Sequence, residues 1–232
     1  MSMRHRAVKA TLDRGYAIEW NDDHEDFPIA RYEYKITAFL NALTNFWDLT
    51  QETSGTATTI ALTSGRVIYV LNATGGAGNI STIRHKVLNA AGDVTSTAAL
   101  PKLTMDLQVG GLTADALTHE FGFFNNADTP FTATQEGAYF RISSNVLYAV
   151  TGTGAAETAT NLGAPDAYAT YRVEINSADV KFYIDDNVTP VATHTTNLPT
   201  GNLNIKLSCA QRAGGSNTIN CDVIILNVLS LA

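Results

Sequence analysis

Short runs of alternating apolar and polar residues, separated by turn residues, make up most of the chain from Ala30 onward. Because successive side chains on a strand point to opposite faces, this alternation predicts β-strands that are buried on one side. About twelve runs follow one another at a spacing of roughly 8–16 residues, which is typical of a β-sandwich or jelly roll. The predicted strands lie at residues 30–40, 65–72, 81–88, 102–109, 119–125, 137–143, 146–152, 157–162, 171–175, 180–185, 190–195, 203–208 and 220–231.

The segment from Tyr171 to Ile184 predicts a β-hairpin that turns at Ser177 and Ala178. In this register all apolar residues share one face, while the other face carries an opposite-charge pair and a cation beside an aromatic ring. A slip of one residue would turn the apolar face to water, so the register is strongly specified. The predicted facing pairs are Tyr171 with Ile184, Arg172 with Tyr183, Val173 with Phe182, Glu174 with Lys181 and Ile175 with Val180.

Residues 1–30 differ from the rest of the chain. They begin with basic residues, continue with an acidic run from Glu19 to Asp26, and show no strand or helix pattern over any length. We predict an extended N-terminal arm over residues 1–30 and a single β-sandwich domain over residues 31–232. The arm is expected either to be solvated or to become ordered against a neighbouring subunit. Its candidate assembly contacts are Arg4, Arg6, Lys9, Arg14, Trp20 and Phe27.

Composition narrows the classes of function. Hydrophobic residues make up 45% of the chain and charged residues 16%, which suits many short strands with few surface helices. The formal net charge of -7 argues against binding of nucleic acid, which needs clustered cations. No apolar run approaches the ~20 residues needed to cross a bilayer, and the first residues do not form a secretory signal. We therefore expect a protein that is made and folded in a cytoplasm.

The two cysteines predict a second hairpin. Cys209 and Cys221 are equidistant from Gly215, and folding the segment about that glycine places Leu207 opposite Val223, with apolar residues on one face. This register also places the two cysteines opposite each other. In a reducing cytoplasm, two buried thiols are favoured over a disulfide.

The segment "YRVEINSADVKFYIDDNVTPVATHTTNLP" is similar to the late strands of the concanavalin A-like, or laminin G-like, sandwich. "NFWDL", "HEFGFFN" and "GAYFRISSNVLYAVTGTG" fit the same outline, which covers residues 40–231. The resemblance implies an all-β fold, a concanavalin A-like jelly-roll sandwich of two antiparallel sheets with an N-terminal arm. The succession of strands resembles most the sandwiches of tailed-phage structural proteins, which decorate capsids or belong to tails.

Residues that would carry catalysis are sparse. Glucanases of this fold carry acids at alternate positions of one strand, in the form E-x-D-x-x-E, and this sequence has no such strand. Glu120 and Glu174 are lone acids on their predicted strands. The histidines show no metal-ligand spacing, and no cofactor is expected. Two oxygen-rich loops are candidates for calcium, although turn chemistry is favoured for both. They hold Asp185, Asp186 and Asn187 in one case and Asn125, Asn126 and Asp128 in the other.

Three functions are weighed. The first is a non-enzymatic virion structural protein, in capsid decoration or associated with the tail, that acts through protein–protein assembly as a homo-oligomer with other virion proteins. The alternative is a carbohydrate-binding module of a receptor-binding tail protein, and the third is a glycoside hydrolase. The expected location is the virion, after synthesis in the host cytoplasm. Candidate ligand-facing aromatic residues are Phe131, Tyr148, Tyr168 and Tyr183.

Overall fold

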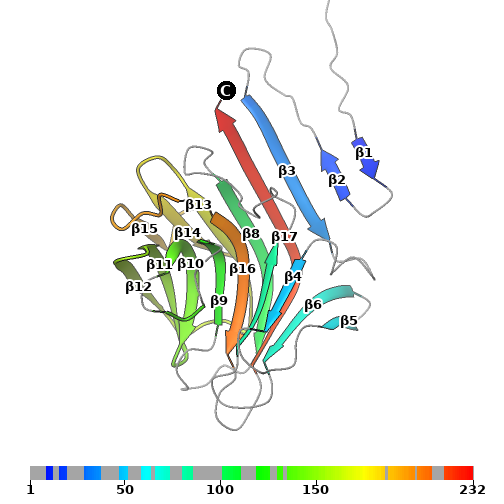
Figure 1. Ribbon diagram of the computed structural model, residues 1–232, viewed down its shortest axis with the longest axis horizontal. Helices are drawn as coiled ribbons and strands as arrows, with labels where there is room; N and C mark the ends of the chain where they lie inside the picture. Colours follow the sequence, from blue (N-terminus) through cyan, green and yellow to red (C-terminus); the bar gives the residue numbers. More distant parts are fainter. Residues whose placement is uncertain are drawn as a thin grey trace, which may run out of the picture.

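The computed structural model is built from β-strands in two sheets that pack face to face (Figure 1). It describes residues 9–12, 16–19, 29–37, 47–51, 59–63, 66–73, 80–85, 101–110, 119–125, 130–132, 135–185, 188–201, 203–210 and 217–231. Side chains are described within these ranges from Lys102 to Ala210, and also at Ile80 and Thr82. In this part of the chain no helix has the length and hydropathy needed to span a membrane.

The strands follow one another along the whole chain. They are β1 (Lys9–Leu12), β2 (Tyr16–Glu19), β3 (Ile29–Thr37), β4 (Trp47–Gln51), β5 (Thr59–Thr63), β6 (Arg66–Ala73), β7 (Ile80–His85), β8 (Pro101–Gly110), β9 (His119–Asn125), β10 (Glu136–Ser143), β11 (Val146–Thr153), β12 (Glu157–Gly163), β13 (Tyr168–Ile175), β14 (Val180–Ile184), β15 (Ala192–His194), β16 (Leu203–Ala210) and β17 (Asn217–Leu231).

The larger sheet has ten strands and the smaller sheet has seven. The larger sheet runs in the order β1-β2-β3-β17-β8-β13-β14-β15, with β6 also paired to β17 and β5 to β6. The smaller sheet runs in the order β12-β11-β10-β9-β16-β7-β4. Neighbouring strands are antiparallel in both sheets, as in β10–β11 and β13–β14. The predicted all-β sandwich of two antiparallel sheets is therefore confirmed.

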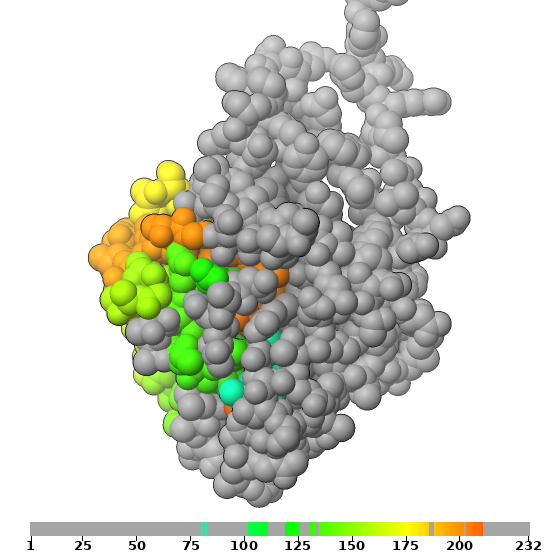
Figure 2. Space-filling model, in the orientation of Figure 1, coloured from blue at the N-terminus to red at the C-terminus, as the bar shows by residue number. Residues whose placement is uncertain are grey.

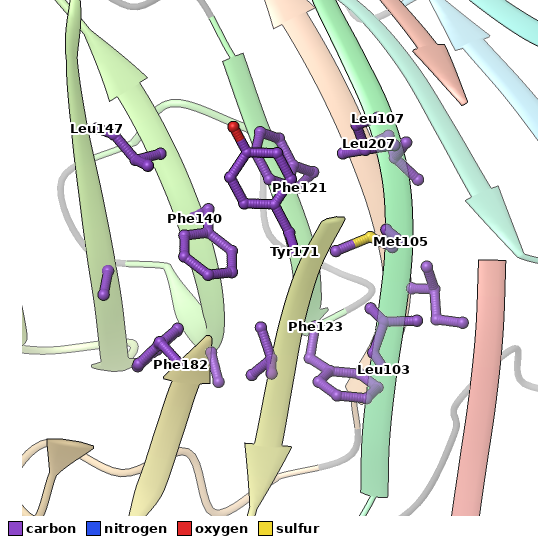
Figure 3. Close-up of a cluster of buried hydrophobic side chains, with 14 of the residues drawn as sticks. Leu103, Met105, Leu107, Phe121, Phe123, Phe140, Leu147, Tyr171, Phe182 and Leu207 are labelled. Atoms are coloured by element: carbon purple, nitrogen blue, oxygen red, sulfur yellow. The ribbon is translucent and has the colours of Figure 1, made fainter. Parts of the chain in front are cut away.

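Aromatic rings from both sheets meet in the centre of the core (Figure 3). The ring centroids of Phe121 in β9 and Tyr171 in β13 are 4.8 Å apart, and those of Phe140 in β10 and Phe182 in β14 are 5.3 Å apart. These four side chains are fully buried, as is Met105 of β8. Aromatic pairs at such separations stabilise the fold beyond the burial of their area, so they hold one sheet over the other.

The predicted hairpin formed by β13 and β14 is confirmed, and all five of its predicted facing pairs are present. Its apolar face lies in the core. On the polar face the guanidinium of Arg172 lies 3.9 Å from the ring centroid of Tyr183. Glu174 forms ion pairs with Lys102 of β8 at 3.1 Å and with Arg172 at 3.2 Å. The cation beside the ring was predicted. The ion pair between Lys102 and Glu174 was not, because β8 is distant from β13 in the sequence.

The predicted hairpin about Gly215 is wrong. β16 lies in the smaller sheet between β9 and β7, whereas β17 lies in the larger sheet. Cys209 therefore pairs with His119 across the ladder and not with Cys221, and it is a buried free thiol. Every residue of β16 is buried. Apolar and polar residues alternate along β16, so its apolar face could be recognised from the sequence, but this alternation does not specify which strand lies beside it.

Two short strands fall within the region predicted as an arm, although its sequence shows no strand pattern. β1 and β2 pair with each other, and β2 also pairs with β3, so the larger sheet extends outward as far as β1 (Figure 1). Lys9 is the first residue of β1. The other residues predicted to make assembly contacts lie outside the described residues. They are Arg4, Arg6, Arg14, Trp20 and Phe27.

Candidate functional site

Polar and aromatic side chains gather on the face of the smaller sheet that points away from the core, here called the outer face. In β10, Tyr139 and Arg141 alternate with the core residues Ala138 and Phe140. Residues directly opposite one another in antiparallel strands share a face, so the neighbouring strands extend the same rows. The outer face holds Glu120, Phe124, Tyr139, Arg141, Tyr148, Val150, Glu157 and Lys206.

Glu120 of β9 is fully buried on this face, with 0% of its surface exposed. Its Oε1 accepts a hydrogen bond from Nε of Arg141 at 2.8 Å. Its Oε2 accepts one from Nε2 of Gln135 at 2.7 Å and one from the backbone N–H of Phe131 at 2.9 Å. A buried carboxylate is costly unless it is paired and hydrogen-bonded, and these three donors meet that requirement.

Arg141 lies between two carboxylates. Besides its bond to Glu120, it donates from Nη1 and Nη2 to the two oxygens of Glu157, each at 3.1 Å. Nη2 also donates to the hydroxyl of Tyr139 at 2.8 Å. The planar fork of a guanidinium suits such bidentate pairing with a carboxylate. The cluster therefore ties β9, β10 and β12 together across the outer face.

Burial dominates the electrostatics of this cluster. It raises the pKa of Glu120, and the charge of Arg141 and the hydrogen bonds from Gln135 and the Phe131 N–H oppose that shift. Burial also raises the pKa of Tyr139, and the Glu120 carboxylate adds to the rise. The phenol of Tyr139 therefore stays neutral at ordinary pH. Shifts of this kind arise where water is largely excluded from charged groups.

Aromatic rings pack beside the cluster. Phe124 and Tyr139 stack with their centroids 4.3 Å apart, and Val150 and the partly buried Tyr148 pack against them. Nζ of Lys206, whose side chain is fully buried, lies 5.4 Å from the ring centroid of Phe124. A cation above an aromatic face is attracted by the negative potential of the ring. The outer face thus combines charged groups with aromatic rings, of which Phe124 and Tyr139 are fully buried.

Gly122 makes this packing sterically allowed. It lies in β9 between Lys206 of β16 and Tyr139 of β10, and its φ is 144°. A Cβ on Gly122 would lie 2.7 Å from Cα of Tyr139. Both the backbone conformation and the close approach of β10 therefore require glycine.

Two of the four predicted ligand-facing aromatic residues lie at the outer face. Tyr148 of β11 pairs with Arg141 across the ladder and is half-buried. Phe131, in the segment between β9 and β10, is half-buried with a φ of 60°, and its N–H binds Glu120. The structure therefore brings Phe131 and Tyr148 to the same charged cluster from different segments.

The other two predicted aromatic residues belong to the larger sheet. Tyr168, the first residue of β13, is 55% exposed. Tyr183 is only 6% exposed and lies under the guanidinium of Arg172. The four residues do not form one site, because the core separates these two from Phe131 and Tyr148.

The acids considered for catalysis or for calcium have structural partners. Glu174 is paired with Lys102 and Arg172. Asp185 has a φ of 55°, and its Oδ1 accepts a hydrogen bond from the N–H of Thr170 at 3.1 Å, as expected for turn chemistry. Among the described residues, no group of three His, Cys, Asp or Glu side chains could hold a metal ion. Asn126, Asp128, Asp186 and Asn187 lie outside the described residues.

The two histidines with described side chains are buried. His119 contacts the carbonyl oxygen of Gly110 through Nε2 at 2.9 Å, while its Nδ1 has no hydrogen-bond partner among the described residues. Burial lowers the pKa of His119 to about 4. Nδ1 and Nε2 of His194 lie 3.0 Å and 2.9 Å from the hydroxyl oxygens of Thr151 and Thr160, and burial lowers its pKa as well. Both histidines therefore remain neutral parts of the core at neutral pH.

Sequence reasoning missed Arg141 and Glu157. It looked for paired acids at alternate positions of a single strand, whereas Glu120 and Glu157 come from β9 and β12. The available signal was the predicted succession of β9, β10, β11 and β12. If these four runs form a meander, Arg141 in the second run falls between the acids of the first and fourth.

Known proteins resemble this chain in structure and not in sequence. No protein-family profile matches it, and neither does any curated protein. The β-glucanase of Bacillus licheniformis aligns with a TM-score of 0.54 and 15% identity, over 84% of this chain and 97% of that one. The exoplasmic/lumenal domain of VIP36, bound to Ca2+ and Man3GlcNAc, has a TM-score of 0.53 and 12% identity, over 83% and 86% of the two chains. A conserved carbohydrate esterase of the Shiga toxin-encoding bacteriophage phi24B has a TM-score of 0.53 and 13% identity, over 80% and 91%.

The fold is that of the concanavalin A-like sandwiches. The resemblance found in the late strands of the sequence thus extends to most of the chain. At such low identity the likeness concerns the fold, and the roles of individual residues must be argued from the outer face itself.

Proposed function

We propose that this chain is a non-enzymatic structural protein of a bacteriophage particle, made in the host cytoplasm and acting through protein–protein assembly in the virion. The observation that carries the non-enzymatic part is the position of Arg141 between Glu120 and Glu157. The presence of a bacteriophage protein among the similar structures supports the viral part.

The chemistry of glycoside hydrolysis explains why Arg141 matters. Hydrolases with two carboxyl groups place both of them on the same glycosidic bond, about 5–5.5 Å apart in retaining enzymes and about 6.5–9.5 Å apart in inverting ones. Here the space between the two carboxylates holds a guanidinium that binds both. Glu120 is also fully buried and accepts three hydrogen bonds. This arrangement supports a role for the acids in holding strands together.

Assembly is supported by the strand order. The larger sheet ends at β1, which among the described strands pairs only with β2. The free edge of a terminal strand offers backbone donors and acceptors to another chain. β1 lies within residues 1–30, the segment predicted to contact neighbours, and Lys9 belongs to it.

Two measurements test this proposal. Mass spectrometry of purified particles, from a phage that encodes the chain, should find it as a stoichiometric component, and its absence would reject the virion role. Hydrolysis of a panel of β-glucans and acetylated sugars should be undetectable. Turnover that Glu120→Gln abolishes, with the fold retained by circular dichroism, would show instead that the protein is an enzyme.

Carbohydrate binding is a second candidate function, favoured by two half-buried aromatic residues, Tyr148, which faces Arg141 across the ladder, and Phe131, whose N–H binds Glu120. Sugar-binding sites combine aromatic surface with hydrogen-bonding groups. The similar structures include a VIP36 domain bound to Man3GlcNAc. A glycan array tests this candidate: binding should be lost in Tyr148→Ala and kept in Tyr168→Ala, which alters the other sheet. No binding by the unaltered protein would remove it.

A further inference from the structure

The outermost strand of the smaller sheet, β12, presents a free edge. It lies at the end of the strand order and at the left of Figure 1, and the yellow-green atoms of this part of the chain reach the surface in Figure 2. One edge of β12 pairs with β11. Within the described part of the chain, the backbone groups of residues 158–161 on the other edge have no hydrogen-bond partner. Such an edge is a template for another strand.

β12 lacks the usual features that prevent edge pairing, which are unpaired charges and proline. Its single charged residue is Glu157, and both carboxylate oxygens of Glu157 bind Arg141 over the outer face. The next four residues are the small or uncharged Thr158, Ala159, Thr160 and Asn161. The register with β11 shifts between the partners Asn161 and Gly163, so the regular part of the edge covers residues 157–161.

The conformation of this edge is fixed by its own sandwich. The hydroxyl oxygen of Thr160 lies 2.9 Å from Nε2 of His194. The hydroxyl oxygen of Thr158 lies 2.9 Å from that of Thr196 and accepts a hydrogen bond from Nδ2 of Asn197 at 3.0 Å. A strand that is held in place before binding loses little conformational entropy when it gains a partner.

We propose that β12 pairs with β12 of a second copy of this chain, antiparallel and about a two-fold axis at Ala159, which is the midpoint of the regular edge. This contact rests on the proposed function in assembly and is one through which copies of the chain would assemble. In this register the β12 side chains that face the core in one copy lie beside those that face the core in the other copy. The smaller sheets of the two copies therefore form one continuous sheet. The facing pairs between copies are Glu157 with Asn161, Thr158 with Thr160 and Ala159 with Ala159.

The distribution of charge favours pairing of β12 with a second β12, and favours antiparallel over parallel pairing. Antiparallel pairing places each Glu157 opposite an uncharged Asn161, at opposite ends of the contact. Parallel pairing in register would bring the two Glu157 carboxylates together, and directly opposed like charges are destabilising. Threonine pairs across strands are favourable, and the alanine at the axis leaves room for its own copy. The edge is therefore complementary to itself, as a two-fold interface requires.

A cysteine at the axis tests the register in the full-length protein. Directly opposed residues have Cα atoms about 4.5–5.5 Å apart, which lies within the range of about 4.4–6.8 Å that a disulfide spans. Ala159→Cys should therefore give a disulfide-linked dimer under mild oxidation. Asn161→Cys is the matched control, since it is exposed on the same face of the same strand. Its two copies would lie about 13 Å apart in this register, so it should not crosslink.

Light scattering of Ala159→Lys gives a second readout. Two lysines at the axis repel each other, so the dissociation constant should rise by up to about fivefold, while the melting temperature at low concentration stays within about 2 °C because Ala159 is exposed. An oligomer whose mass is unchanged by Ala159→Lys, or equal crosslinking by both cysteine variants, would overturn the β12 contact. A chain that stays monomeric and uncrosslinked would overturn it too. Absence of the chain from particles would reject only the proposed function.

Discussion

Glu120 and Glu157 share one cation, Arg141, although they lie on β9 and β12, which are not neighbouring strands. From β10, the arginine pairs with the fully buried carboxylate of Glu120 on the adjacent β9 and reaches over β11 to the half-buried carboxylate of Glu157 on β12. The two acids are therefore not equivalent, and their substitution should have different costs.

Replacement of Arg141 by methionine should be strongly destabilising. Arg141→Met retains much of the side-chain volume but leaves Glu120 buried without a cation, and breaking a buried pair in this way costs about 3–5 kcal/mol. The free energy of unfolding from urea denaturation measures the effect. Glu157→Gln is the control, because the carboxylate of Glu157 is partly exposed and such pairs contribute about 1 kcal/mol or less. Equal losses in the two variants would contradict the assigned asymmetry.

Acid should destabilise the protein through His119. The pKa of His119 is lowered in the folded state to about 4, from a reference value of 6.5, so folding favours the neutral ring. Its contribution to stability is complete above pH 6.5 and is lost as the pH falls from 6.5 to 4. The maximum loss is about 3 kcal/mol.

Denaturation curves at pH 7 and pH 4.5 measure this dependence. His119→Gln cannot titrate and should be less sensitive to acid than the unaltered protein over the same interval. An identical pH dependence in both proteins would show that other groups, such as the buried His194, control acid stability.

Gly122→Ala should destabilise by about 2 kcal/mol or more, because the new Cβ would meet the backbone of Tyr139 at a φ that side chains rarely adopt. Gly163→Ala is a matched control. Its φ is 91°, but no described residue lies within 4 Å of the added Cβ, so it should show only the conformational cost of about 1 kcal/mol. Thermal denaturation compares the two, and equal shifts would mean that the contact with β10 contributes nothing.

Calcium should leave the stability unchanged. One oxygen of Asp185 is already used by the N–H of Thr170 in the turn that follows β14, so we assign this loop to turn chemistry. The melting temperature should be the same, within about 1 °C, in excess EDTA and in millimolar Ca²⁺. A rise with Ca²⁺ that Asp185→Asn abolishes would show an ion site in that loop.

The sequence predicted strand pairing where one face of each strand is exposed to water. The hairpin of β13 and β14 was placed correctly in register because Arg172 and Glu174 alternate with buried residues and the turn is short. β16 also alternates between apolar and polar residues, but its own pattern does not specify the strand with which it pairs. β1, β2, β4 and β5, each of four or five residues, were not predicted as strands.

The candidate site was harder to predict than the fold. Phe131 and Tyr148 could be named because sugar binding generally requires aromatic rings beside hydrogen-bonding groups. Arg141 and Glu157 could not, because their roles depend on which strands lie side by side. That information lies in the order in which β9, β10, β11 and β12 pair, and not in any one strand.

The long last strand has a consequence for biosynthesis. β17 pairs with β3, β6 and β8, and in one of these pairings Ile29 faces Leu231. The larger sheet therefore cannot close until residues 217–231 have left the ribosome. Until then β8 has an open edge, and its apolar residues Leu103 and Met105 lack part of their cover. Contacts between such distant residues form slowly, so the nascent chain spends an interval in which it is prone to aggregate.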